Sequence, residues 1–293
     1  MTDAPLAESI AGVARSPSVP SVFVLGAGRS GAGQVFALLA QHPELAALTR
    51  LDERLMRTPL FGRLGGRRRT RPGELSDGAR FWRKLLGDRF EHSYTWLSRP
   101  DPETNIEIRR LVERFCTRRR AAVFAARMTG PPRIAYLRAL FPRARFVQVV
   151  REPEEEVGLR VAALRKGRPQ LTWTKDIPDF LGPYLAAAER TGDPVAIATA
   201  EGEALRRAMA AELAAEQCAR SARQVEVAAF ARDPAAGTRA LWTWLELRED
   251  PKLSARLAGA RLRIEAAPPL DEADRRSFEI WRGKAEGLAP PRR

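Results

Sequence analysis

Short apolar runs alternate with stretches of helical spacing along the chain. The first well-marked run, residues 21–25, is continuous and rich in β-branched and aromatic side chains, and it stops at a glycine-rich stretch, 26–33. Apolar positions then recur at helical spacing over 34–42, with Val35 and Leu38 on one face. This pattern predicts a strand, a glycine turn and a helix, in that order.

A second unit of the same kind lies at 133–167. Its first part has the spacing of a helix that ends before Pro142, and residues 145–150 form a run typical of a buried strand. Three glutamates, 154–156, open the next predicted helix, where the helix dipole favours acidic side chains. Further helices are expected at 77–120, 173–223 and 232–247, and a further strand at 223–230.

Helices that alternate with short strands predict an α/β protein of three layers, with a mostly parallel central sheet flanked by helices. The 293 residues suffice for one large domain or two small ones. We expect a flexible leader at 1–20 and a single α/β domain at 21–267. Because 268–293 carries two Pro-Pro pairs, we expect an irregular C-terminal tail there.

Charge is the strongest departure from an ordinary globular composition. Lys and Arg number 50 against 36 Asp and Glu, which gives a formal net charge of +14. Two explanations fit this excess: a chain generally rich in Ala and Arg, or an anionic partner that a positive field attracts. No zinc-ligand spacing, basic zipper or aromatic RNA-binding signature accompanies the charge, so no specific nucleic-acid partner is expected.

The cysteines and the apolar content bear on the compartment. Cys116 and Cys218 lie far apart and form no metal or redox motif, as expected in a reducing compartment. The first residues lack a basic region followed by an apolar run, and no stretch approaches the roughly 20 apolar residues of a membrane span. We therefore expect a cytoplasmic protein without a signal peptide, a transmembrane segment or a bound metal.

The glycine stretch is the main candidate site. Residues 26–31 match the pattern G-x-G-x-x-G of dinucleotide-binding domains, and they equally fit a loop in which Arg29 and Ser30 face a phosphate. Glycines let the backbone approach an anion, and free N–H groups at a helix start donate hydrogen bonds to it. A bound anion therefore follows from either interpretation.

Two other nucleotide-binding classes can be weighed from the same stretch. A Walker A loop needs Lys and then Ser or Thr after its last glycine, whereas Gly31 is followed by Ala32 and Gly33, which disfavours an ATPase or GTPase. The G-x-G-x-x-G match leaves a FAD- or NAD-dependent oxidoreductase as an alternative function. In that case Asp52 or Glu53, after a second strand, would bind the ribose.

Three segments in order resemble the PAPS-dependent sulfotransferase family. The stretch 22–33, VFVLGAGRSGAG, with a following helix that ends in His-Pro-Glu, resembles its 5′-phosphosulfate loop. The stretch 127–157 resembles its 3′-phosphate-binding segment, where a helix ends in Phe-Pro and a strand leads to an Arg-acid-Pro turn. The stretch 223–247 resembles the later Asp-Pro segment. The resemblance implies a P-loop-like sulfotransferase fold with PAPS as the sulfuryl donor.

The resemblance also implies roles for single residues. The 5′-phosphosulfate would be bound by Gly28, Arg29, Ser30 and Gly31. Arg151 would pair with the 3′-phosphate, a contact suited to a planar and permanently charged guanidinium. Arg29 would also neutralise charge on the leaving nucleotide, and Glu53 would act as general base toward the acceptor. That acceptor would be a hydroxyl or amine of a carbohydrate, a lipid or a small natural product.

The chain departs from the family pattern where phosphate is bound. Ala32 and Gly33 stand where Thr is usual, and Leu159 stands where a Ser contacts the 3′-phosphate. Arg160, next to Leu159, is a candidate substitute. Each lost charge-assisted hydrogen bond costs about 1.5–3 kcal/mol of nucleotide affinity. A protein that keeps the fold and binds anions without catalysis is therefore a third possibility.

Overall fold

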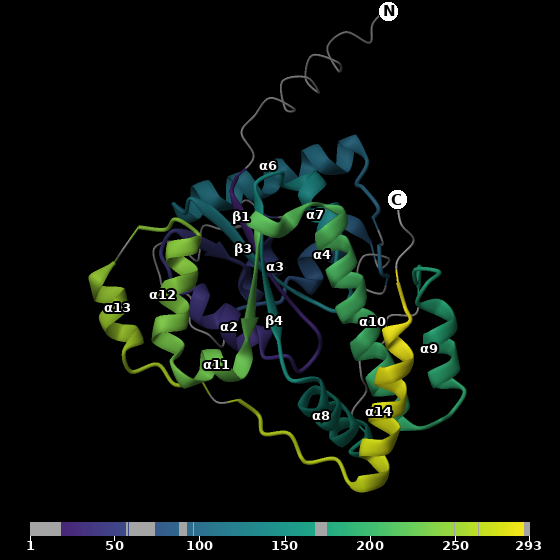
Figure 1. Ribbon diagram of the computed structural model, residues 1–293. Helices are drawn as coiled ribbons and strands as arrows, with labels where there is room; N and C mark the ends of the chain where they lie inside the picture. Colours follow the sequence, from purple (N-terminus) through teal and green to yellow (C-terminus); the bar gives the residue numbers. More distant parts are fainter. Residues whose placement is uncertain are drawn as a thin grey trace, which may run out of the picture.

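An all-parallel sheet lies at the centre of the fold, seen in the computed structural model in Figure 1. The structure describes residues 19–56, 58, 74–87, 93–95, 97–167, 175–248, 250–262 and 264–289, so most of the predicted leader lies outside it. Five strands form the sheet in the order β2-β3-β1-β4-β5. They are β1 (Ser21–Gly26), β2 (Leu45–Ala47), β3 (Val123–Thr129), β4 (Ala144–Val150) and β5 (Ala222–Glu226).

Strand β1 lies in the middle of the sheet, between β3 and β4, and is buried along its whole length. Side chains alternate between the two faces of a strand. Phe23 and Leu25 therefore join the hydrophobic cluster on one face, and Val22 and Val24 join the cluster on the other. Burial on both faces explains why this run is continuously apolar in the sequence.

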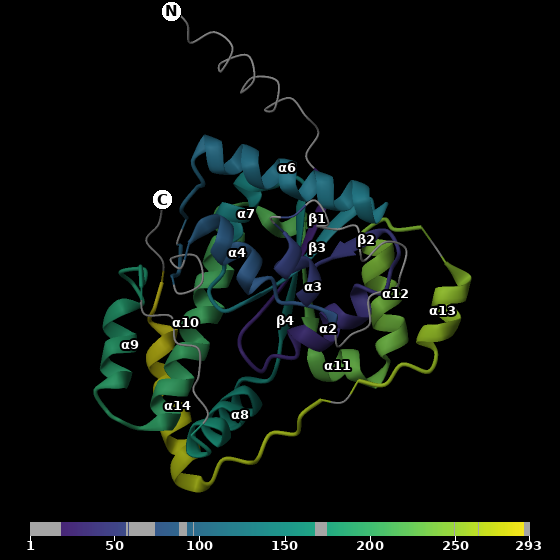
Figure 2. The ribbon, with the colours of Figure 1, turned by 180° about the vertical axis from the view of Figure 1, so that it is seen from behind.

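Helices cover both faces of the sheet, which confirms the three-layer prediction (Figures 1 and 2). On one face lie α4 (Ala79–Leu86), α6 (Pro102–Arg119) and α7 (Ile134–Leu140). On the other lie α2 (Ala32–Leu39), α12 (Pro234–Trp244) and α13 (Pro251–Leu257). In the described part of 77–120, the expected helical stretch forms two separate helices, α4 and α6.

Four further helices pack together beyond the carboxyl end of β4 (Figure 1): α8 (Pro153–Arg165), α9 (Gly182–Glu189), α10 (Pro194–Ala215) and α14 (Glu272–Glu286). The prediction of an irregular tail at 268–293 is therefore wrong for Glu272–Glu286, which form α14. The Asp271 carboxylate accepts the N–H of Asp274 and starts this helix, and Phe278 and Trp281 are buried in it. Pro268 and Pro269 precede this helix, and the second Pro-Pro pair lies beyond the described residues.

The later predicted strand is shorter than expected. β5 ends at Glu226, and the rest of the expected stretch is α11 (Val227–Arg232). The reason is a helix cap, because the Glu226 carboxylate accepts the backbone N–H groups of Ala228 and Ala229. A further short helix, α3 (Arg50–Leu55), follows β2.

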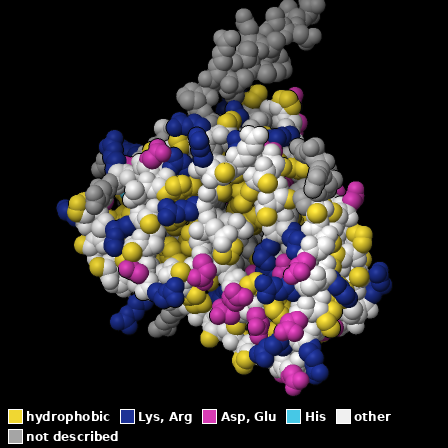
Figure 3. Space-filling view, in the orientation of Figure 1, with side chains coloured by type: hydrophobic (Ala, Val, Ile, Leu, Met, Phe, Trp, Pro, Cys, Tyr) yellow, Lys and Arg dark blue, Asp and Glu magenta, His cyan; other side chains and the backbone are white. Residues whose placement is uncertain are grey.

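Charged side chains are spread over the face shown in Figure 3 and form no single basic patch there. Carboxylates gather in its lower half, around α8 and α14, where they alternate with arginines. Arg165 pairs with Asp274 at 2.8 Å, and Arg275 pairs with Glu154 at 3.3 Å. Exposed ion pairs of this kind add little stability.

Candidate functional site

A cavity of about 530 Å³ opens at the carboxyl edge of the sheet. It lies where β1 runs into the glycine loop and where β3 and β4 end, the position at which open α/β sheets bind ligands. Its lining consists of Ala27, Gly28, Arg29, Gly31, Ala32, Gly33, Gln34, Asp77, Arg127, Thr129, Arg151 and Glu265. The structure thus brings the glycine loop and Arg151, more than a hundred residues away, to one cavity.

The glycine loop turns sharply between β1 and α2. Gly31 has φ 90°, a left-handed conformation that favours glycine, and Arg29 has φ 73°. Within the described residues, the backbone N–H groups of Gly28, Gly31 and Gly33 have no hydrogen-bond partner. These donors lie around the start of α2, where the helix dipole also favours negative charge. The loop therefore offers an anion several unused donors.

Three arginines among the described residues line the cavity, and two of them, Arg29 and Arg151, were expected from the sequence. The third, Arg127, comes from β3 and lies against the glycine loop: a Cβ on Gly33 would come within 2.2 Å of its Nη1. Its Nη2 lies 3.5 Å from Oδ2 of Asp77, and its buried Nε has no partner. Gly33 thus makes room for a guanidinium beside the loop, where a larger residue would displace it.

Arg151 follows β4 directly and is buried, with 5% of its surface exposed. Its Nη1 donates to the backbone carbonyl of Glu265 at 2.9 Å and lies 3.6 Å from Oε2 of Glu155. Its Nε is buried and has no hydrogen-bond partner among the described residues. A buried, charged guanidinium with an unused donor is costly unless an anion completes its hydrogen bonds.

Glu265 places a carboxylate at the same cavity. Its Oε2 lies 2.9 Å from Nη1 of Arg29, and the two side chains are 60% and 30% exposed. The segment that carries it connects α13 to α14 and passes over the carboxyl edge of the sheet (Figure 2). Glu265 therefore binds one cavity arginine by its side chain and another, Arg151, by its carbonyl.

Three of the expected cofactor residues do not line the cavity. Ser30 is buried, with its Oγ 3.4 Å from the N–H of Ala32, and Leu159 is buried on α8. Arg160 is also buried and pairs with Glu156 at 3.0 Å and with Glu201 at 3.4 Å. Burial raises the pKa of the Glu201 carboxyl, and Arg160 opposes that rise. The structure gives Arg160 a place in an ion-pair cluster between α8 and α10.

Glu53, the expected base, also lies outside the cavity lining. It is buried on α3, and its Oε1 accepts the backbone N–H groups of Arg80 and Phe81 at 3.1 and 3.2 Å. The carboxylate therefore caps the start of α4. Sequence periodicity gave no sign of this contact, because it joins two different helices at positions 27 and 28 residues apart in the chain.

Replacing Glu53 with Ala should lower the free energy of unfolding by about 1–3 kcal/mol, because two N–H groups of α4 lose their acceptor. Urea denaturation measures the loss. Glu107→Ala, at an exposed position of α6, is the matched control and should change stability by less than about 0.5 kcal/mol. Glu53→Gln keeps an acceptor oxygen and should stay stable.

The described residues contain no group of three or more His, Cys, Asp or Glu that could hold a metal ion, and Cys116 and Cys218 are both buried thiols. Nor does any helix among them combine the length and apolar character needed to cross a bilayer. The described polar groups that line the cavity are backbone amides, three guanidinium groups, the carboxylates of Asp77 and Glu265, and the side chains of Gln34 and Thr129.

The fold and the cavity define a three-layer α/β protein with an arginine-lined site at the carboxyl edge of a parallel sheet. A family model described as "Sulfotransferase family" matches residues 20–251. The chain therefore belongs to the sulfotransferase family, and the resemblance seen in its sequence is confirmed. No curated protein sequence matches the chain significantly.

Solved structures share this fold at low sequence identity. Sulfotransferase STF1 from Mycobacterium tuberculosis H37Rv is 16% identical, with a TM-score of 0.54, over 92% of this chain and 79% of that chain. Sulfotransferase STF9 from Mycobacterium avium is also 16% identical, with a TM-score of 0.52, over 96% of this chain and 80% of that chain. The expected α/β sulfotransferase fold is thereby confirmed for a divergent member.

Proposed function

We propose that the protein transfers a sulfuryl group from PAPS to a hydroxyl or amine of a carbohydrate, lipid or small natural product. The observation that carries the proposal is the shared cavity of the glycine loop and Arg151. PAPS has phosphate groups at both ends of its ribose, and two separate cationic sites within one cavity suit such a ligand.

The residues present fit this nucleotide. A volume of about 530 Å³ lies within the range of small-molecule sites. The unused N–H groups of Gly28, Gly31 and Gly33, with Arg29 and Arg127, would hold the 5′-phosphosulfate. Arg151 would hold the 3′-phosphate, which would complete the hydrogen bonding of its buried Nε.

PAPS supplies a sulfuryl group already activated on a phosphate, so the protein's task is mainly positioning and charge stabilisation. Arg29 and Arg127 stabilise the negative charge that grows on the oxygen that leaves with the nucleotide. Asp77, 3.5 Å from Arg127, holds that side chain in place at the cavity.

The oxidoreductase alternative is not favoured by the contacts of its expected ribose ligands. Oδ2 of Asp52 accepts the N–H of Thr49 at 2.9 Å and pairs with Arg119. The Glu53 carboxylate caps α4. The carboxylates of Asp52 and Glu53 are therefore buried and hydrogen-bonded within the protein, and neither lines the cavity. A dinucleotide-binding fold needs an acid at this place that is free to bind a ribose.

A thermal-shift panel tests the proposed nucleotide. Ligands that bind only the native state raise the melting temperature by mass action, with about 2.7 kcal/mol gained at a hundredfold excess over Kd. PAPS and its product 3′-phosphoadenosine 5′-phosphate should stabilise the protein, and NAD, FAD and ATP should do so far less. A response to NAD or FAD alone would support the oxidoreductase. A response to the product nucleotide without transfer to any acceptor would support the anion-binding protein.

Replacing Glu265 with Gln should strengthen binding of 3′-phosphoadenosine 5′-phosphate about three- to fivefold, since an exposed ion pair contributes at most about 1 kcal/mol. The reason is competition, because the Glu265 carboxylate occupies Arg29 in the free protein. Isothermal titration calorimetry measures the change. Glu272→Gln removes an equal charge from an exposed position on α14 and should leave the affinity unchanged. Weaker binding by Glu265→Gln would mean that Glu265 assists the nucleotide.

A further inference from the structure

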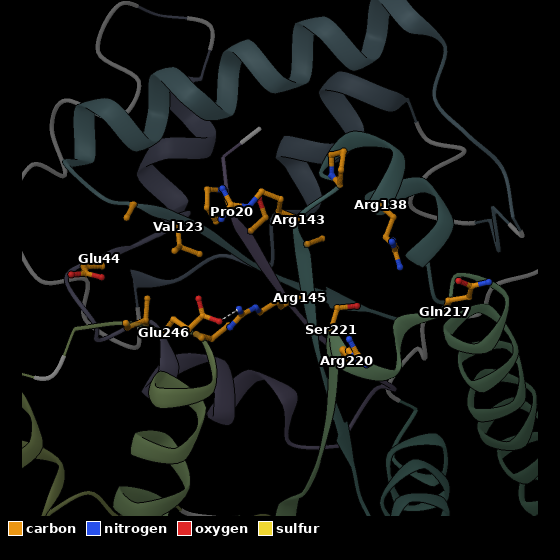
Figure 4. Close-up of a pocket in the computed structure, with 16 residues that line it drawn as sticks. Pro20, Glu44, Val123, Arg138, Arg143, Arg145, Gln217, Arg220, Ser221 and Glu246 are labelled. Atoms are coloured by element: carbon orange, nitrogen blue, oxygen red, sulfur yellow. Dashed lines mark hydrogen bonds and ion pairs between the residues drawn. The ribbon is translucent and has the colours of Figure 1, made fainter. Parts of the chain in front are cut away.

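A second cavity, of about 510 Å³, lies at the opposite, amino-terminal edge of the sheet (Figure 4). We call it the amino-edge cleft. Strands β1, β3 and β4 begin at it, through Ser21, Val123 and Ala144, and Ser221 before β5 also lines it. It shares no lining residue with the cavity at the carboxyl edge. The roles derived for the glycine loop and Arg151 therefore leave it unexplained.

Four arginines of the described chain line the amino-edge cleft, and two of them form hydrogen bonds within the protein. Arg138 donates to the carbonyl of Glu216, at the end of α10. Arg145 donates to the carbonyl of Trp244, at the end of α12, and pairs with Glu246, as the dashed line in Figure 4 shows. Cations commonly stabilise helix C-termini in this way, so these two arginines have a structural role.

Arg143 and Arg220, the other two arginines, have no such role. Both are exposed, and in the described part of the chain neither makes a hydrogen bond or an ion pair. They come from different segments, Arg143 just before β4 and Arg220 just before β5, and both reach the same cleft (Figure 4). Helix capping therefore does not account for these two charges.

The carboxylates of the cleft do not balance these charges. Glu246 is paired with Arg145, and Oε1 of Glu44 lies 3.6 Å from Nε of Arg248. Two guanidinium groups thus have no counter-charge among the described residues, in a cleft large enough for a small organic ligand. Guanidinium groups bind phosphate and sulfate oxygens through paired, charge-assisted hydrogen bonds.

We propose that the amino-edge cleft is a second anion site, which binds a small ligand carrying a phosphate or sulfate ester through Arg143 and Arg220. The site is independent of the proposed transfer reaction, because the sheet separates it from the glycine loop. Arg138 and Arg145 fix the cleft walls by holding the ends of α10 and α12.

Isothermal titration calorimetry with 4-nitrophenyl phosphate and 4-nitrophenyl sulfate tests this site. Binding of the preferred ester should weaken at least about tenfold in the double variant Arg143→Ala/Arg220→Ala, because charge-assisted hydrogen bonds are lost. The same binding should persist in Arg29→Ala and also in the wild type saturated with 3′-phosphoadenosine 5′-phosphate, which separates the amino-edge cleft from any ester binding at the carboxyl-edge cavity. The tighter-bound ester shows whether phosphate or sulfate is the natural group.

The matched control is Arg190→Ala/Arg232→Ala, which removes two exposed and unpaired arginines that do not line the cleft. This variant should bind the ester as the wild type does. An equal loss in both double variants would overturn the proposal in favour of a general charge effect, and so would absence of binding by both esters. Both arginines of the test variant are exposed, so its melting temperature should match that of the wild type.

Discussion

Replacing Arg151 with Met should weaken binding of 3′-phosphoadenosine 5′-phosphate about 100-fold, which corresponds to about 2.7 kcal/mol. Arg151 is buried at the end of β4, and its Nε has no partner in the described residues. A 3′-phosphate bound there would form charge-assisted hydrogen bonds in a site largely shielded from water, where such bonds are strongest. Isothermal titration calorimetry gives the two affinities.

Adenosine 5′-phosphate supplies the internal control for Arg151, because it lacks the 3′-phosphate. The wild type should prefer the bisphosphate by about the factor that Arg151→Met loses, and the variant should bind both nucleotides alike. Arg223→Met, at an exposed position of β5, should keep the wild-type preference. If Arg151→Met still distinguishes the two nucleotides, another residue binds the 3′-phosphate.

Replacing Arg29 with Ala should lower kcat for sulfuryl transfer about 10²–10³-fold, the usual cost of removing one group that stabilises transition-state charge. Arg29 lines the cavity from the glycine loop, and its only side-chain partner among the described residues is the exposed carboxylate of Glu265, so we expect its loss to cost little stability. Steady-state assays with PAPS and the best acceptor of a hydroxyl and amine panel measure the effect.

Two comparisons keep the Arg29 result interpretable. The melting temperature of Arg29→Ala should stay near that of the wild type, and Arg29→Lys should recover part of the rate, since a positive charge returns without the planar guanidinium. Arg232→Ala, at an exposed arginine on α11, should leave the rate unchanged. Wild-type turnover by Arg29→Ala would remove this residue from the reaction.

The sequence predicted the parts of the site that depend on local pattern. A continuous apolar run, a glycine turn and a helical period follow one another at β1 and α2, so this unit is readable from adjacent residues. The same holds for β4 and the turn that carries Arg151. Because both strands are parallel and adjacent, their carboxyl ends meet at one edge, which brings the two predicted anchors together.

The residues that the sequence missed depend on contacts between distant segments. Arg127 reaches the loop because β3 pairs with β1 in a register that sets Val24 opposite Arg127, and no local period encodes that register. Glu265 reaches Arg29 because α13 and α14 hold the ends of its segment. Arg160 was expected at the nucleotide because it stands next to Leu159, where the family usually has a phosphate-binding Ser. Its guanidinium instead pairs with Glu156 and Glu201, away from the cavity.

The sequence contains the signal for the C-terminal helix α14, but the neighbouring Pro-Pro pairs led to the prediction of an irregular tail. Phe278, Trp281 and Ala285 recur at helical spacing, and Asp271 is a good cap. The two Pro-Pro pairs suggested an irregular tail, yet prolines outside a helix do not disturb it. Packing of this apolar face against α10 then stabilises the helix.

The most direct measurement is a crystal structure of the protein with 3′-phosphoadenosine 5′-phosphate. We expect the 5′-phosphate on the backbone amides of residues 28–33 and the 3′-phosphate on the guanidinium of Arg151, with the Glu265 side chain released from Arg29. A nucleotide bound elsewhere, or one whose 3′-phosphate makes no contact with Arg151, would rule out the proposed binding site.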